Sequence, residues 1–213
     1  KQIQFLRDLE TIWRRDTVVK FEESLQTRND HLFVKEDPAR IYRGLRDLLV
    51  DEFDIDRIEK GKNEFNVSKP KDRMRMHAFK EKSTHTVIHY RLSWKAKPPK
   101  DIYKMDRPDD ILKARMKTTG EVVTVYPGAN PLSVMPKKKM QYPQTRIDNS
   151  GLQAEKTSAF QRSKLYKILV GIWYNKFYSK EIEKYEEEGD ETIVQLHDLI
   201  REKFGVESGI AKT

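Results

Sequence analysis

The sequence predicts an α+β fold in which a curved antiparallel sheet, with one apolar and one basic face, is packed by a long C-terminal helix. Three stretches between residues 72 and 118 alternate apolar and polar residues, which is typical of strands with one buried face. Residues 158–189 place apolar side chains at helical spacing around most of the helix, which predicts a long and largely buried helix. We expect a single domain, residues 1–213.

Each of the three expected strands, residues 72–80, 83–97 and 111–118, places its even-numbered residues on the apolar face. The odd-numbered positions are rich in Arg, Lys and His and contain no Asp or Glu. Solvated strand faces usually mix charges, because like charges on neighbouring strands repel each other. We therefore expect an anionic partner on this face, with an ordinary solvated face as the alternative. The candidate contacts are Arg73, Arg75, Arg91, Lys95, Lys97, Lys113, Arg115 and Lys117.

The net charge of +8 is concentrated in the middle of the chain. Residues 69–146 contain 19 Lys and Arg against 7 Asp and Glu, whereas the segments on either side are slightly acidic. This distribution is typical of a localised polyanion-binding surface rather than of a generally basic protein. Residues 127–157 form an expected long loop with several prolines. Its lysine cluster, Lys137, Lys138 and Lys139, is a candidate flexible arm for the same partner.

The N-terminal part of the chain is expected to add helices and short strands to the fold. Asp37 followed by Pro38 is a typical helix start, and apolar residues recur on one face after it, so residues 38–53 are predicted to be a helix. Arg28-Asn29-Asp30 predicts a turn. The other expected elements are an amphipathic helix at residues 3–15 and strands at residues 17–25, 32–35 and 63–67.

Two glycines are expected to interrupt regular structure in the C-terminal half. Gly120 predicts a hairpin that leads into a further strand at residues 121–126. Ser158, with Gln161 three residues later, predicts the start of the long helix, and Gly189 predicts its end. Asp190 then starts a separate accessory helix, residues 190–205.

The order of strands, helix, antiparallel sheet and long C-terminal helix resembles that of helix-grip proteins. In that family the sheet curls around the C-terminal helix and leaves an apolar cavity, so the resemblance implies a pocket for a hydrophobic ligand. The alternative is that the same side chains pack as an ordinary core. The pocket residues that the resemblance implies are Met74, Met76, Tyr90, Leu92, Trp94, Met116, Ile168 and Ile172.

No catalytic residue, metal site or cofactor is predicted. The chain lacks cysteine, which excludes a thiolate nucleophile and favours a reducing, cytoplasmic compartment over secretion. His85 and His89 lie four residues apart, which in a strand is about 13 Å and too far to share a metal. Phosphate-binding glycine loops and known nucleophile motifs are missing from the sequence. The longest apolar run, residues 168–174, is far shorter than the roughly 20 residues of a membrane-spanning helix.

These observations favour a noncatalytic protein that binds an anionic partner, with a nucleic-acid backbone as the first expectation. Cations on a sheet position a phosphate backbone without reading bases, so binding should depend on charge and shape and weaken steeply with salt. One alternative is a hydrophobic-ligand or lipid-binding protein. Another is an assembly module that docks on an acidic protein or an anionic membrane surface, with self-association through the acidic residues 186–191 included.

Overall fold

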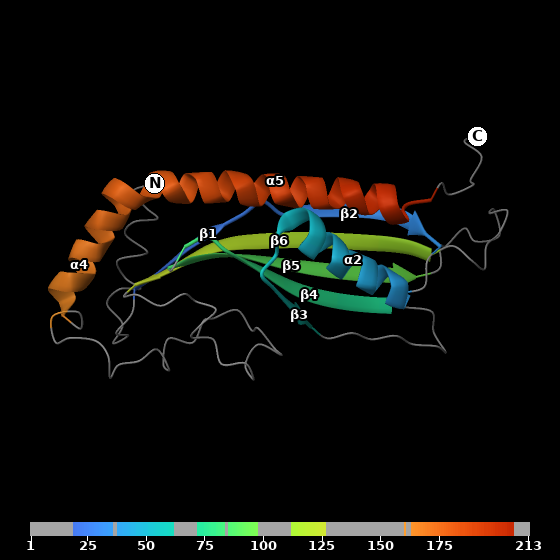
Figure 1. Ribbon diagram of the computed structural model, residues 1–213, viewed down its shortest axis with the longest axis horizontal. Coiled ribbons are helices and arrows are strands. Elements are labelled where there is room, and N and C mark those ends of the chain that lie inside the picture. Colours follow the sequence, from blue (N-terminus) through green and yellow to red (C-terminus); the bar gives the residue numbers. More distant parts are fainter. Residues whose placement is uncertain are drawn as a thin grey trace. The chain divides into compact units, whose positions relative to one another are not determined.

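The computed structural model has the predicted α+β fold, with a six-stranded antiparallel sheet that is not closed and a long C-terminal helix that packs on it (Figure 1). It describes residues 19–35, 38–61, 72–83, 85–97, 112–126, 160 and 163–206. The strands are β1 (Val19–Ser24), β2 (Arg28–Val34), β3 (Arg57–Lys60), β4 (Asp72–Glu81), β5 (Thr86–Lys97) and β6 (Leu112–Tyr126). The helices are α2 (Pro38–Phe53), α4 (Lys164–Trp173), the π-helix η6 (Tyr174–Tyr178) and α5 (Ser179–Phe204).

The strand order is β1-β6-β5-β4-β3, and β2 also pairs with β6. The long strand β6 pairs with β1 through its C-terminal half and with β2 through its N-terminal half. The chain divides into two compact units. Unit 1 comprises residues 1–24, 81–88 and 121–188, and unit 2 comprises residues 25–80, 89–120 and 189–213.

In unit 2, the even-numbered face of the strands is buried against α2 and the second half of α5. Leu45 of α2 lies with Met74, Met76 and Met116 around one small internal cavity. The α5 residues Ile193, Leu196 and Ile200 are fully buried and recur at helical spacing. Figure 1 shows α2 lying over the strands and this half of α5 running along β2. The predicted apolar sheet face is therefore the core of this unit.

The predicted helix at residues 38–53 is confirmed as α2. Ile41, Leu45, Leu48 and Leu49 are buried at the spacing of one helix face, while the residues between them are mostly exposed. Asp54, just after the helix, has a positive φ of 49°, which reverses the chain toward β3. The expected N-cap Asp37, the helix at residues 3–15 and the strand at residues 63–67 lie outside the described residues.

Gly120 and Gly189 do not interrupt the structure as predicted. Gly120 lies inside the continuous strand β6, and Gly189 lies inside the continuous helix α5, so residues 190–205 belong to α5. Both glycines make room for the buried side chain of Leu25. A Cβ atom on Gly120 would lie 2.6 Å from Leu25 Cδ1, and one on Gly189 would lie 2.5 Å from it. These glycines are present for close packing and not for a turn.

Three other predicted boundaries are wrong. Residues 28–30 belong to β2, and the chain reverses before them, because Arg28 and Asp30 make contacts with α5 that outweigh their turn preference. Strand β5 begins at Thr86, since Ser83 closes the preceding turn by accepting hydrogen bonds from backbone N–H groups. The long helix begins at Lys164, with Ser163 as its N-cap and not Ser158, which lies outside the described residues.

In unit 1, β1 pairs with residues 121–126 of β6, and a helix packs beside them through aromatic and hydroxyl contacts. Phe21 of β1 stacks on Tyr174 of η6, with ring centroids 3.7 Å apart. The Tyr178 hydroxyl lies 3.0 Å from the hydroxyl of Thr86, which lies 2.8 Å from that of Thr124. The prediction that this helix is largely buried is wrong, because most of the apolar side chains of α4 are exposed.

Candidate functional sites

The clearest charged feature of unit 2 is a set of seven exposed cations on the odd-numbered face of three neighbouring strands. We call this set the basic strip; its members are Arg73 and Arg75 of β4, Lys95 and Lys97 of β5, and Lys113, Arg115 and Lys117 of β6. Each cation alternates with a buried residue on the opposite face, so the strand period of two places all of them on the outer side. The eighth strand candidate, Arg91, is half-buried. The lysine cluster at residues 137–139 lies outside the described residues.

Strand β2 extends the outer face next to the basic strip, which the sequence did not predict. Its residues Asn29, His31 and Phe33 lie opposite Lys117, Arg115 and Lys113. The Arg115 guanidinium lies within 3.4 Å of the Asn29 amide oxygen, and the Lys113 ammonium lies over the Phe33 ring. The sequence does contain a pattern that predicts this strand, because the residues at positions 29, 31 and 33 alternate with those at positions 30, 32 and 34. The pattern was not recognised because residues 28–30 were predicted to form a turn.

Three lysines of the strip lack a carboxylate partner among the described residues. Within the described part of the chain, no carboxylate forms an ion pair with Lys95, Lys97 or Lys117. Asp30 is the acidic residue of β2. It lies on the inner face of the sheet, on the same side of the strand as the buried residues Leu32 and Val34. Like charges on neighbouring strands repel each other, so the strip favours an anionic partner.

Toward β3, the same sheet face carries a different set of side chains. His77 Nδ1 lies 3.0 Å from His89 Nε2, both rings are buried, and Phe79 stacks on His89. Glu59 of β3 lies opposite His77; burial raises its pKa, and its ion pair with Arg57 opposes this shift. Phe79 is therefore a packed residue and not an exposed platform for stacking a base. The pairing of His77 with His89 was also missed, because the register between β4 and β5 cannot be read from the sequence.

A buried polar network joins α5 to the sheet in unit 2. His197 Nδ1 lies 2.9 Å from Asp30 Oδ2, and His197 Nε2 lies 2.9 Å from the Thr118 hydroxyl. Arg28 and Arg201 also pair with Asp30. Enzymes with a nucleophilic hydroxyl also connect a carboxylate, a histidine and a hydroxyl in series by hydrogen bonds. Here Thr118 and His197 are almost fully buried, so the hydroxyl has no access to a substrate and the network is structural.

Burial sets the protonation of this network. Burial lowers the pKa of His197, and the hydrogen bond and charge of Asp30 offset only part of this shift. Burial also raises the pKa of Asp30, but the hydrogen bond from His197 and the charges of His197, Arg28 and Arg201 outweigh it and hold that pKa below its usual value. A neutral imidazole that donates from Nδ1 to the Asp30 carboxylate and accepts from Thr118 at Nε2 satisfies all three groups.

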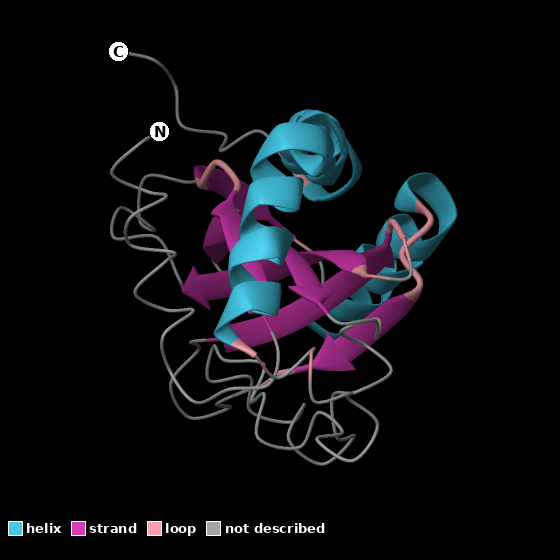
Figure 2. Ribbon diagram, turned by 90° about the vertical axis from the view of Figure 1, so that its left-hand side faces the viewer, coloured by secondary structure: helices cyan, strands magenta, loops and turns pink. Residues whose placement is uncertain are grey.

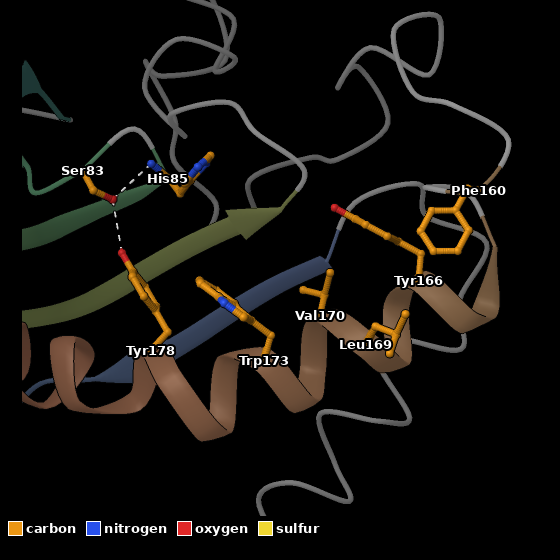
Figure 3. Close-up of a pocket in the computed structure, with 8 residues that line it drawn as sticks. All are labelled: Ser83, His85, Phe160, Tyr166, Leu169, Val170, Trp173 and Tyr178. Carbon is orange, nitrogen blue, oxygen red and sulfur yellow. Dashed lines mark hydrogen bonds between the residues drawn. The ribbon is translucent and has the colours of Figure 1, made fainter.

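Unit 1 contains an open, largely apolar pocket of about 590 Å³ (Figure 3). Phe160, Tyr166, Leu169, Val170 and Trp173 line it on one side, and Ser83, His85 and Tyr178 complete it. Figure 3 shows the Ser83 hydroxyl bonded to the backbone of His85 and to the Tyr178 hydroxyl. The serine is thus engaged in closing a turn, and no histidine in the described part of the chain is hydrogen-bonded to its hydroxyl through the imidazole ring.

The residues of the implied helix-grip pocket lie in two places. The six sheet residues, Met74 to Met116, are buried in unit 2, and the cavity that five of them line with α2 has a volume of only about 10 Å³. A single water needs roughly that much space, so these side chains are packed as a core. Ile168 and Ile172 lie on α4 in unit 1, where both are exposed.

No protein-family model matches the chain, and no curated protein matches its sequence. Among the described residues, no three His, Asp or Glu side chains are grouped as metal ligands would be. The helices that the structure describes include none that is both long and apolar enough to cross a membrane.

Proposed function

We propose that the protein binds the phosphate backbone of a nucleic acid through the basic strip, without catalysing a reaction. The observation that supports this proposal is the set of seven exposed cations on three neighbouring strands, with no acidic side chain among them. Strands in a sheet lie about 4.8 Å apart, so cations on three of them form an array that is broad enough to contact several phosphates. The absence of cysteine fits a cytoplasmic location, where such a partner is found.

The composition of the strip favours a nucleic acid over a lipid surface. None of the large exposed apolar side chains in the described part of the chain lies on β4, β5 or β6. A membrane-docking surface normally combines cations with exposed apolar residues. Since Phe79 is packed against His89, the strip lacks an aromatic platform for bases, and we expect contacts to phosphates rather than sequence readout.

The first prediction is that reversing two strip charges weakens nucleic-acid binding. Lys95→Glu with Lys117→Glu changes two exposed lysines that make no ion pair with a described residue. We expect wild-type protein to bind a labelled short duplex. The logarithm of the association constant should fall with the logarithm of the salt concentration, with a slope of about −0.9 for each phosphate that is neutralised. The double variant should lose at least about tenfold in affinity at low salt, which corresponds to about 1.4 kcal/mol. Fluorescence anisotropy with a duplex and a single strand, at several salt concentrations, measures both effects.

The matched control places the same change in net charge elsewhere. Arg46→Glu with Lys203→Glu alters exposed cations of α2 and α5 and should leave most of the binding intact. If both double variants bind equally weakly, overall charge and not the strip is responsible. If wild-type protein binds neither nucleic acid at low salt, the proposal is wrong, and the strip becomes a candidate docking surface for an acidic protein or a membrane.

A further inference from the structure

The helix α4 turns its apolar stripe toward solvent. Leu165, Ile168, Leu169 and Ile172 occupy one face at the spacing that normally packs against a core, yet all four are about half exposed. The opposite face, which contains Lys167, Val170, Gly171 and Tyr174, is the buried one. Within unit 1, no other described helix or strand covers the outer side of α4 (Figure 2). We call these four residues the α4 stripe.

Exposed apolar side chains are concentrated around this stripe. Of the ten large hydrophobic residues that are exposed in the described part of the chain, seven lie between Phe160 and Phe177. Phe177 is 63% exposed, and Trp173 is 39% exposed. Contiguous apolar patches of this kind on a protein surface mark interaction sites. The open pocket continues the same surface, because Leu169 and Trp173 line it (Figure 3).

The charge around the stripe favours an anionic partner. Residues 163–180 contain four lysines and no Asp or Glu, and the first acidic residue after this segment is Glu181. The three exposed lysines lie at both ends of the stripe: Lys164 before it, and Lys176 and Lys180 after it. Cations near an anionic bilayer contribute about 1 kcal/mol each. Trp and Tyr side chains are enriched at the boundary between water and lipid, and Tyr166 and Trp173 lie next to the α4 stripe.

We propose that α4 and η6 dock on the surface of an anionic membrane, with the α4 stripe inserted at the level of the headgroups and the flanking lysines on the lipid phosphates. A helix with an apolar face and flanking cations lies in the interface with that apolar face buried. The α4 helix can do this without unfolding, because the face opposite the α4 stripe already packs on the protein. The proposal is independent of the basic strip, since it depends on other residues in the other unit.

The test is co-sedimentation of the intact chain with vesicles of phosphatidylcholine, with and without phosphatidylserine. We expect binding to the phosphatidylserine vesicles and much weaker binding to pure phosphatidylcholine. Ile168→Ser with Ile172→Ser should weaken binding by about tenfold or more, since tenfold is only about 1.4 kcal/mol and two isoleucines bury more than that. Val50→Ser, an equally exposed apolar residue on α2, is the matched control and should bind as wild type. Lys176→Glu with Lys180→Glu should remove the preference for phosphatidylserine.

Four results would overturn the proposal: no binding of wild-type protein, equal binding of the stripe variant, equal weakening by Val50→Ser, or binding lost only in the strip variant Lys95→Glu with Lys117→Glu. Loss of self-association in the stripe variant, measured by light scattering, together with no wild-type vesicle binding would assign the stripe to a second copy of the chain. Thermal unfolding of each variant establishes that it is folded. Nucleic-acid binding by the strip is measured separately, so either proposal can fail alone.

Discussion

At the scale of single residues, the buried groups explain how α5 is held and which histidine has a structural role. His197 satisfies Asp30 and Thr118 at once, and Arg28 and Arg201 add charge to the same carboxylate. Removing the imidazole would leave buried polar partners unsatisfied, which costs about 1–3 kcal/mol for each group. The network therefore holds the second half of α5 on β2 and β6, and its geometry alone would have suggested catalysis if its burial had been ignored.

The network predicts that the protein becomes less stable as the pH falls. The pKa of His197 is lowered in the folded state from the usual 6.5, so between these two values the unfolded chain binds more protons than the folded one. This contribution to stability is complete above pH 6.5 and is lost as the pH falls through the folded pKa. The Asp30 pKa is also lowered, so further stability is lost below 3.8. Urea unfolding of wild type and His197→Gln at pH 7.5 and 5.5 tests the first step.

His197→Gln should be less stable than wild type at pH 7.5 and should lose less stability between the two pH values, because glutamine does not titrate. His31→Gln, which changes an exposed histidine on the outer sheet face, is the control and should retain the wild-type pH dependence. An unchanged pH dependence in His197→Gln would show that this histidine does not control acid stability.

At the scale of elements, two glycines allow β6 and α5 to run without interruption past Leu25. Leu25 donates its backbone N–H to the Gly120 carbonyl, and its side chain fills the space beside both glycines. A local reading treats glycine as a break in a strand or a helix, because its backbone freedom makes it unfavourable in both. Here the absence of a side chain stabilises the packing of distant segments, which outweighs the local preference.

Gly120→Ala should destabilise the protein by about 1–3 kcal/mol, since the new Cβ atom would overlap Leu25. Leu25→Ala removes the overlapping atoms, so Gly120→Ala should cost much less in that background. Chemical denaturation of the two single variants and the double variant measures the coupling. Strict additivity would mean that Leu25 is not the reason for glycine at this position.

In the helix formed by α4 and η6, the face with the strongest apolar pattern is not the face that packs on the protein. Tyr174 is buried on Phe21, whereas the α4 stripe is exposed. We expect Ile168→Ser with Ile172→Ser to change the free energy of unfolding by less than about 0.5 kcal/mol for each site, as for other surface positions. Tyr174→Ala should cost about 3 kcal/mol or more, since it removes a buried aromatic ring. Denaturation curves distinguish the two, and a large loss in the stripe variant would place the stripe in the core.

At the scale of the whole molecule, the two candidate surfaces differ in chemistry and belong to different units. The basic strip in unit 2 is cationic and without exposed apolar groups, which favours a hydrophilic polyanion. The α4 stripe in unit 1 is apolar with lysines at its ends, which favours a bilayer surface. The strip and stripe variants should therefore have separate effects, with salt weakening nucleic-acid binding far more than the apolar part of vesicle binding.

The sequence by itself determined the fold class, the helix α2 and the outward row of cations, because each depends on a periodicity that local geometry imposes on the backbone. Only the tertiary structure decided what Gly120, Gly189, residues 28–30 and the α4 stripe do. Their roles depend on what lies beside them. Leu25 lies beside the glycines, α5 lies beside β2, and no other described element of unit 1 lies on the outer face of α4. Periodicity defines an apolar face, but the contacts made by the folded chain decide whether that face is covered.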